Sequence, residues 1–112
     1  MNDQTPWGTG ERPVRLSPAQ TETIRQAVRE AFGPAAVVRL FGSRVDPAQR
    51  GGDIDLHIET DLPPEQALEA EMRLYALLQR RLGPQRIDIV THRRGQPLRP
   101  IDREAHRTGV LL

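Results

Sequence analysis

The stretch Asp53-Ile-Asp-Leu-His-Ile58 alternates strictly between polar and apolar residues. A β-strand turns successive side chains to opposite faces, so the three apolar residues of this stretch are expected to face a core. Asp53, Asp55 and His57 then share the other face. Two carboxylates at this spacing have Cα atoms about 6.5–7 Å apart, so both can reach one cation.

The segments around this strand predict a small domain of helices and strands. A capping serine and a proline, Ser17-Pro18, start a helix that Gly33-Pro34 ends. Further strands are expected at 36–41 and 86–90, with a last helix over 101–108. The longest helix is expected between the loop Thr60-Asp-Leu-Pro-Pro64 and Gly83-Pro84, which stops it. The order α-β-β-α-β-α predicts an α+β or α/β layer with helices covering one face of a sheet.

The long helix contains more apolar residues than one narrow stripe needs. We expect its core-facing stripe to be formed by Leu68, Met72, Tyr75, Leu78 and Leu82. Leu74 and Leu77 are expected to widen this stripe. Residues 1–16 are rich in proline and glycine and are expected to form a loose N-terminal arm, with Trp7 docked on the domain. The domain itself is expected to span 17–112.

Composition narrows the class of protein. The chain has 112 residues, 37% hydrophobic and 28% charged, which suits one domain with a small core. A net charge of +1 argues against non-specific nucleic-acid binding. No apolar stretch approaches the roughly 20 residues that cross a bilayer, and the first residues do not resemble a secretory signal, so a cytoplasmic protein is expected.

Two residue types are missing, and each absence excludes a kind of site. Without cysteine there is no disulfide framework, no thiolate zinc site and no cysteine nucleophile. All 16 basic residues are arginine, so a P-loop lysine, a Schiff-base lysine and a lysine general base are excluded as well.

The candidate site begins with the two aspartates of the central strand. Carboxylates held this close repel each other and need a counter-charge, which Mg²⁺ or Mn²⁺ supplies. Asp88 lies mid-strand among β-branched hydrophobic residues, a position that is explained if it is a third ligand beside Asp53 and Asp55. Two metal ions about 3.5–4 Å apart could then activate an attacking oxygen and neutralise a leaving pyrophosphate.

A phosphate-binding turn is expected opposite these carboxylates. Gly42-Ser43 follows the first predicted strand directly, and a glycine there lets backbone N–H groups approach a phosphate closely. Ser43 adds a hydroxyl donor, and Arg44 and Arg50 could contact phosphate oxygens. A phosphate-binding turn opposite a carboxylate cluster is the arrangement that phosphoryl or nucleotidyl transfer needs.

Each of these residues also has a purely structural interpretation. Asp53 and Asp55 could line a solvated strand face, and Asp88 could be a charge that protects an edge strand from aggregation. Gly42 could serve only the turn, and the two loop arginines could simply be solvated. His57 shares the aspartate face and could touch substrate or metal, but it is expected to be a polar surface residue, since no ligand partner at metal spacing is visible. His92 and His106 are expected at surface positions as well.

Gly42-Ser43, Gly52-Asp-Ile-Asp-Leu56 and the later Asp88 resemble the Gly-Ser, Asp-x-Asp and distant Asp signature of the polymerase-β nucleotidyltransferase superfamily. Size and order of elements are similar to its minimal nucleotidyltransferase (MNT) branch, over roughly residues 36–90. The chain departs from many MNT sequences at Gly52, where serine is usual, and at Pro47 in the loop.

The resemblance implies a mixed sheet with helices on one face, bound ATP with two Mg²⁺ ions, and transfer of a nucleoside monophosphate to an acceptor hydroxyl. It implies that Asp53 and Asp55 bind both metals. Asp88 would bind the catalytic metal and help to activate the acceptor, and Gly42 and Ser43 would hold the triphosphate.

The resemblance also implies a protein partner. Small MNT proteins are often encoded beside a helical HEPN-type partner, and there they act as antitoxins, some by transferring AMP to a partner tyrosine. So short a chain carries no acceptor-binding domain, which favours the alternative of a non-catalytic antitoxin or partner-binding subunit. Apolar surface on the long helix and at Val110-Leu-Leu112 predicts pairing with that partner or a homodimer.

Overall fold

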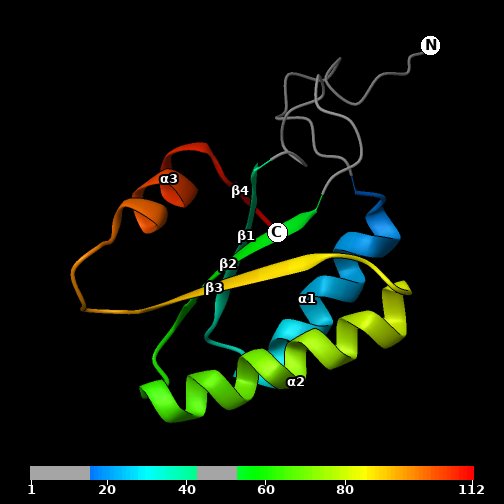
Figure 1. Cartoon of the computed structure of the whole chain (residues 1–112), viewed down its shortest axis with the longest axis horizontal. Helices are drawn as coiled ribbons and strands as arrows, with labels where there is room; N and C mark the ends of the chain where they lie inside the picture. The colour runs from blue at the N-terminus through cyan, green and yellow to red at the C-terminus, as the bar shows by residue number, and fades with distance from the viewer. Residues whose placement is uncertain (1–15, 43–52) are drawn as a thin grey trace.

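The computed structural model describes residues 16–42 and 53–112, which form three helices and a four-stranded mixed sheet (Figure 1). The elements in chain order are α1 (Pro18–Phe32), β1 (Val37–Phe41), β2 (Ile54–Thr60), α2 (Pro64–Leu82), β3 (Ile87–Arg93), α3 (Pro100–Thr108) and β4 (Val110–Leu111). This is an α+β fold consistent with polymerase-β-like architecture, which confirms the predicted fold class. The N-terminal arm up to residue 15, with Trp7, lies outside the described residues, whereas Leu16 packs into the core.

The sheet has the strand order β3-β2-β1-β4. Strand β1 pairs antiparallel with both β2 and β4, and β2 pairs parallel with β3. A parallel pair needs a crossover connection, and α2 supplies it. The parallel pair therefore brings the start of β2 beside the start of β3.

Helices α1 and α2 lie together on one face of the sheet (Figure 1). Helix α1 begins with a capping box: the Ser17 hydroxyl accepts a hydrogen bond from the Gln20 backbone N–H at 3.0 Å, and the Gln20 side chain accepts one from Ser17 N–H at 2.9 Å. The largest fully buried apolar side chains between these layers are Ile24, Leu40, Ile54, Leu56, Ile58, Leu74 and Leu78. The three apolar residues of the alternating stretch thus face the core.

The core-facing side of α2 differs from the predicted stripe. The buried residues of this helix are Ala67, Ala70, Leu74, Leu77 and Leu78. Leu68, Met72 and Tyr75 are 57%, 66% and 46% exposed, so the expectation that Tyr75 packs in the core is wrong. The apolar residues of α2 cover more than one side of the helix, and packing against both α1 and the sheet selects the side that carries the alanines.

The third helix packs against the opposite face of the sheet, the face that carries His57 (Figure 1). The expectation that the helices cover one face therefore holds for α1 and α2 but is wrong for α3. Helix α3 lies on the other face, where its buried Asp102 binds His57. The chain then adds β4, which the sequence pattern did not predict because its two residues are too few to show alternation. None of the described helices is long and apolar enough to cross a membrane.

Candidate functional site

Strands β2 and β3 bring two of the three predicted carboxylates together. Asp55 and Asp88 are direct partners in the parallel register, so their side chains lie on the same face of the sheet. This is the face opposite the α1–α2 layer. Asp55 is partly buried on the inner strand, whereas Asp88 is exposed on β3, which is an edge strand.

The closeness of the two carboxylates perturbs the ionisation of Asp55. Burial raises the pKa of Asp55 to about 6, together with the negative charge of Asp88, a hydrogen bond with Asp88 and the charge of Asp53. Among residues 16–42 and 53–112, no basic side chain forms an ion pair with Asp55. Oxygen ligands with unrelieved negative charge suit a hard divalent cation, so the residues present fit a Mg²⁺ or Mn²⁺ site.

Asp53 is placed differently from the other two aspartates. It precedes β2, and its Oδ2 forms an ion pair with Arg86 Nε at 3.4 Å on an exposed part of the surface. Within the described residues, the ligand atoms of the three aspartates do not all lie within 4.8 Å of one another. The structure thus gathers Asp55 and Asp88, while Asp53 contributes its charge from the side and is paired with an arginine.

Gly42, at the end of β1, lies directly against this pair. Its backbone has φ +80°, in the left-handed region that favours glycine, and a Cβ there would collide with Oδ2 of Asp55. The glycine therefore allows the chain to pass close to the carboxylate. The predicted binding of a phosphate by this turn stays a prediction. Ser43, Arg44 and Arg50, the other predicted phosphate-binding residues, lie outside the described residues.

A groove of about 400 Å³ lies between α2 and β3 and has Asp88 in its lining. Its lining consists of Glu71, Met72, Tyr75, Ile87, Asp88 and Ile89. The exposed apolar side of α2 thus adjoins one of the candidate catalytic residues. The sequence pattern missed this feature because it assigned Met72 and Tyr75 to the core.

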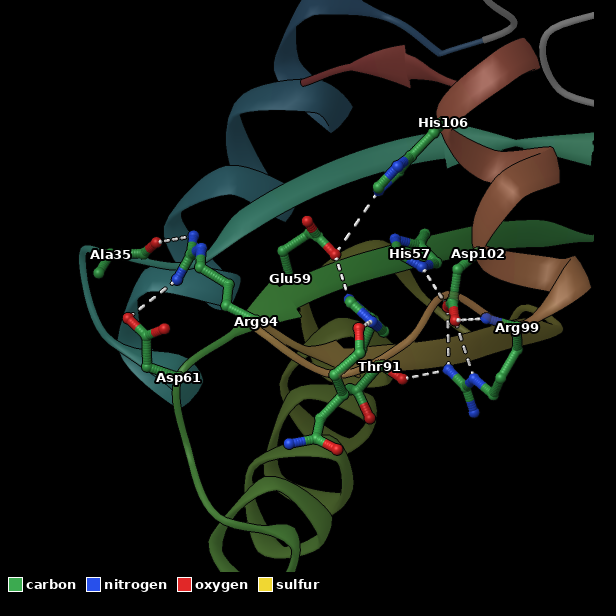
Figure 2. Close-up of polar contacts among 11 residues, drawn as sticks. Ala35, His57, Glu59, Asp61, Thr91, Arg94, Arg99, Asp102 and His106 are labelled. Carbon is green, nitrogen blue, oxygen red and sulfur yellow. Dashed lines mark hydrogen bonds and ion pairs between the residues drawn. The ribbon is translucent and has the colours of Figure 1, made fainter.

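His57 is a buried residue, which corrects the expectation of a surface histidine. Its side chain is fully buried, and its Nε2 lies 2.8 Å from Oδ1 of Asp102, which α3 supplies (Figure 2). Asp102 also accepts hydrogen bonds from the backbone N–H of Arg99 at 2.7 Å and from Arg99 Nε at 2.9 Å. Nothing in the sequence spacing indicates this contact, because the two partners belong to distant elements.

A second buried histidine forms an ion pair on the same face. His92 is 7% exposed, again against expectation, and its Nδ1 lies 2.7 Å from Oε2 of Glu59. The other ring nitrogen of His92 lies 2.9 Å from the carbonyl oxygen of Gln96. Both nitrogens therefore face acceptors, which suits the protonated ring with two N–H donors. His106 on α3 is exposed, as expected.

The surroundings of the two buried histidines shift their pKa values in opposite directions. Burial lowers the pKa of His57 and outweighs the opposing effect of the hydrogen bond that His57 donates to Asp102. Burial also opposes the charged form of His92, but its hydrogen bonds to Glu59 and Gln96 raise the pKa of that ring. Although burial favours the neutral acid, hydrogen bonds from Arg99 and His57 hold the pKa of Asp102 well below its usual range.

Comparison with known proteins adds no family assignment. No protein-family model matches the sequence, and no characterised protein matches it significantly. Functional inference therefore starts from the carboxylate pair, the glycine beside it and the adjoining groove.

Proposed function

We propose that this chain is a metal-dependent nucleotidyltransferase that transfers a nucleoside monophosphate, AMP from ATP, to an acceptor hydroxyl. The observation that carries the proposal is the pairing of Asp55 with Asp88 on one sheet face, against a glycine whose Cβ would collide with Asp55. The motif resemblance and the α+β fold support it further.

Each residue of the proposed site would have its own role in the transfer. Asp53, Asp55 and Asp88 would hold two Mg²⁺ ions, and Asp53 would exchange its exposed Arg86 partner for them. Bound Mg²⁺ neutralises the triphosphate charge and makes the acceptor hydroxyl easier to deprotonate. Gly42 leaves room for the Asp55 carboxylate at the turn that would hold the triphosphate. The acceptor hydroxyl would give its proton to the Asp88 carboxylate as its oxygen bonds to the α-phosphorus. The bond from that phosphorus to the bridging oxygen would break, and pyrophosphate would leave with the electron pair of that bond.

A protein acceptor is favoured by the surface next to Asp88. Leu68, Met72 and Tyr75 expose a run of apolar surface on α2, and the groove beside Asp88 includes two of them. Exposed apolar surface of this kind is typical of protein-binding sites. A HEPN-type helical partner docked there would present a hydroxyl to the carboxylates.

The same apolar surface favours a second candidate function. The chain could act as an antitoxin or partner subunit by binding alone, using the exposed side of α2 without catalysis. A variant with an inactivated carboxylate distinguishes the two functions: Asp55→Asn abolishes transfer in the first case, and leaves neutralisation of the partner complete in the second.

The test incubates the protein with Mg²⁺, ATP labelled on its α-phosphate and the product of the neighbouring gene. We expect label on the partner, and loss of label to background with Asp55→Asn or Asp88→Asn. Asp61→Asn is the matched control, because Asp61 is an exposed carboxylate whose ion pair with Arg94 lies outside the site. Unchanged transfer in the Asp55→Asn variant, or no transfer and no Mg²⁺-dependent ATP binding by the natural chain, would contradict the proposal.

A further inference from the structure

All three histidines of the chain gather where α3 covers the sheet. His57 comes from β2, His92 from β3 and His106 from α3. The ring centroids of His57 and His106 lie 5.5 Å apart, and those of His57 and His92 lie 6.4 Å apart. Glu59 lies among them, and Figure 2 shows His106 reaching down from α3 toward it.

One nitrogen in this cluster has no hydrogen-bond partner within the described part of the chain. His57 is fully buried, and its Nδ1 is the only buried side-chain nitrogen or oxygen among the described residues that makes no hydrogen bond. The other ring nitrogen is held by Asp102 at 2.8 Å. The Asp102 carboxylate can only accept, so the hydrogen sits on Nε2 and the lone pair of the neutral ring is on Nδ1. A buried lone pair without a donor or a cation is costly.

We propose that His57 Nδ1, the Glu59 carboxylate and His106 Nε2 bind a divalent transition-metal ion, Zn²⁺ being the expected one. One ligand atom from each of these residues lies within 4.8 Å of the other two. The His106 Nε2 and Glu59 Oε2 atoms are 3.6 Å apart. Two ligands about 2.1 Å from a tetrahedral ion are about 3.4 Å apart, so small side-chain adjustments complete the site.

The surroundings of the three ligands match those of a metal site. Metal-bound histidines usually donate their other ring N–H to a carboxylate or carbonyl, as His57 does to Asp102. Both nitrogens of His92 are engaged, so His92 orients Glu59 and is not itself a ligand. His106 is 31% exposed, which gives an ion a path from solvent to the buried His57.

Ligand chemistry separates this site from the aspartates of the proposed function. Two imidazoles and one carboxylate suit Zn²⁺ and its neighbours in the first transition row, whereas Mg²⁺ prefers oxygen ligands. Three protein ligands leave a further coordination position open to water or to a bound molecule. The ion would also link α3 to β2, so its binding should stabilise the folded chain.

The test is a titration of the chelator-treated full chain with Zn²⁺ in excess Mg²⁺, followed by calorimetry. We expect one Zn²⁺ per chain, at least about tenfold weaker binding in His106→Gln, and no change in Arg103→Gln, an exposed residue of the same helix. Asp55→Asn should bind Zn²⁺ like the natural chain, which makes this outcome independent of the nucleotidyltransferase proposal.

A second measurement needs no variant. Zn²⁺ should shift the NMR signals of His57 Nδ1 and His106 Nε2 in the natural chain and leave the ring nitrogens of His92 protonated. The proposal is overturned if the natural chain binds no Zn²⁺, if His106→Gln binds it undiminished, or if Asp55→Asn alone abolishes binding. Zn²⁺-induced shifts confined to residues outside the three ligands would overturn it equally.

Discussion

Replacing Asp102 with alanine tests how α3 is held on the sheet. Asp102 is fully buried and connects three groups: the His57 ring, the Arg99 side chain and the backbone N–H of Arg99 at the start of α3. The alanine variant removes all of these contacts at once. It leaves the rest of α3 unchanged, because alanine is the best helix former.

The cost follows from the surroundings of each lost contact. A buried His57 N–H without an acceptor costs about 1–3 kcal/mol. Losing the bond that closes the first turn of α3 costs about 1 kcal/mol. The Arg99 side chain is 54% exposed, so its ion pair contributes at most about 1 kcal/mol. We therefore expect the free energy of unfolding to fall by about 3–4 kcal/mol. This value is near the lower end of the range of about 3–5 kcal/mol that removing one partner of a buried ion pair costs.

Urea unfolding followed by circular dichroism at pH 7, with a chelator present, measures this change. The chelator keeps any ion bound at His57 from contributing. The pKa of Asp102 is depressed in the folded state, so its stabilisation is complete above the ordinary carboxyl pKa of about 4 and is lost as the pH falls below it. Glu104→Ala is the control, because Glu104 is an exposed acid on the same helix.

Comparing the two variants shows whether the buried His57–Asp102 contact stabilises the folded chain. We expect Glu104→Ala to change the unfolding free energy by about 0.5 kcal/mol or less. A loss below about 1 kcal/mol in Asp102→Ala, equal to that of the control, would refute the reasoning that the His57–Asp102 contact fixes α3.

Two further predictions concern the carboxylate pair. Gly42→Ala should abolish nucleotide transfer, because its Cβ collides with Oδ2 of Asp55, whereas Gly95→Ala should keep transfer, since it has a similar φ of +88° but nothing within 4 Å. Both variants should lose about 1–2 kcal/mol of stability on unfolding in denaturant, and equal activities would contradict the steric argument. In the Mg²⁺-free protein, a carboxyl NMR titration should give Asp55 a pKa of about 6, and Asp88→Asn should lower it, though burial keeps it above 3.8. Because this pKa is raised on folding, the unfolding free energy should fall as the pH rises from about 4 to 6, and Asp55→Asn should remove that slope.

The local pattern of the sequence was sufficient for most of the fold. Strict alternation placed Ile54 in the core and Asp55 on the opposite face, because a strand has a side-chain period of two whatever surrounds it. Ser17 and Pro18 marked the start of α1 for an equally local reason. The order of these elements narrowed the fold to an α+β or α/β layer, and the family resemblance implied the mixed sheet.

Contacts between distant segments could not be predicted from local sequence patterns. The sequence suggested that Asp88 lies beside Asp55, but only the parallel register of β2 and β3 makes them direct partners. The exposed side of α2, with Tyr75, was decided by packing against α1 and the sheet, since the helix is apolar on more than one side. The meeting of His57 with Asp102 depended on where α3 docks.

The sequence by itself thus determined where the three helices and the three longer strands lie, and which side chains of one strand share a face, because these follow from bonding geometry within a few residues. Only the tertiary structure decided which of those faces meet. It paired Asp55 with Asp88 and enclosed His57 beneath α3, because strand register and helix docking minimise a free energy summed over the whole chain, which no local pattern contains.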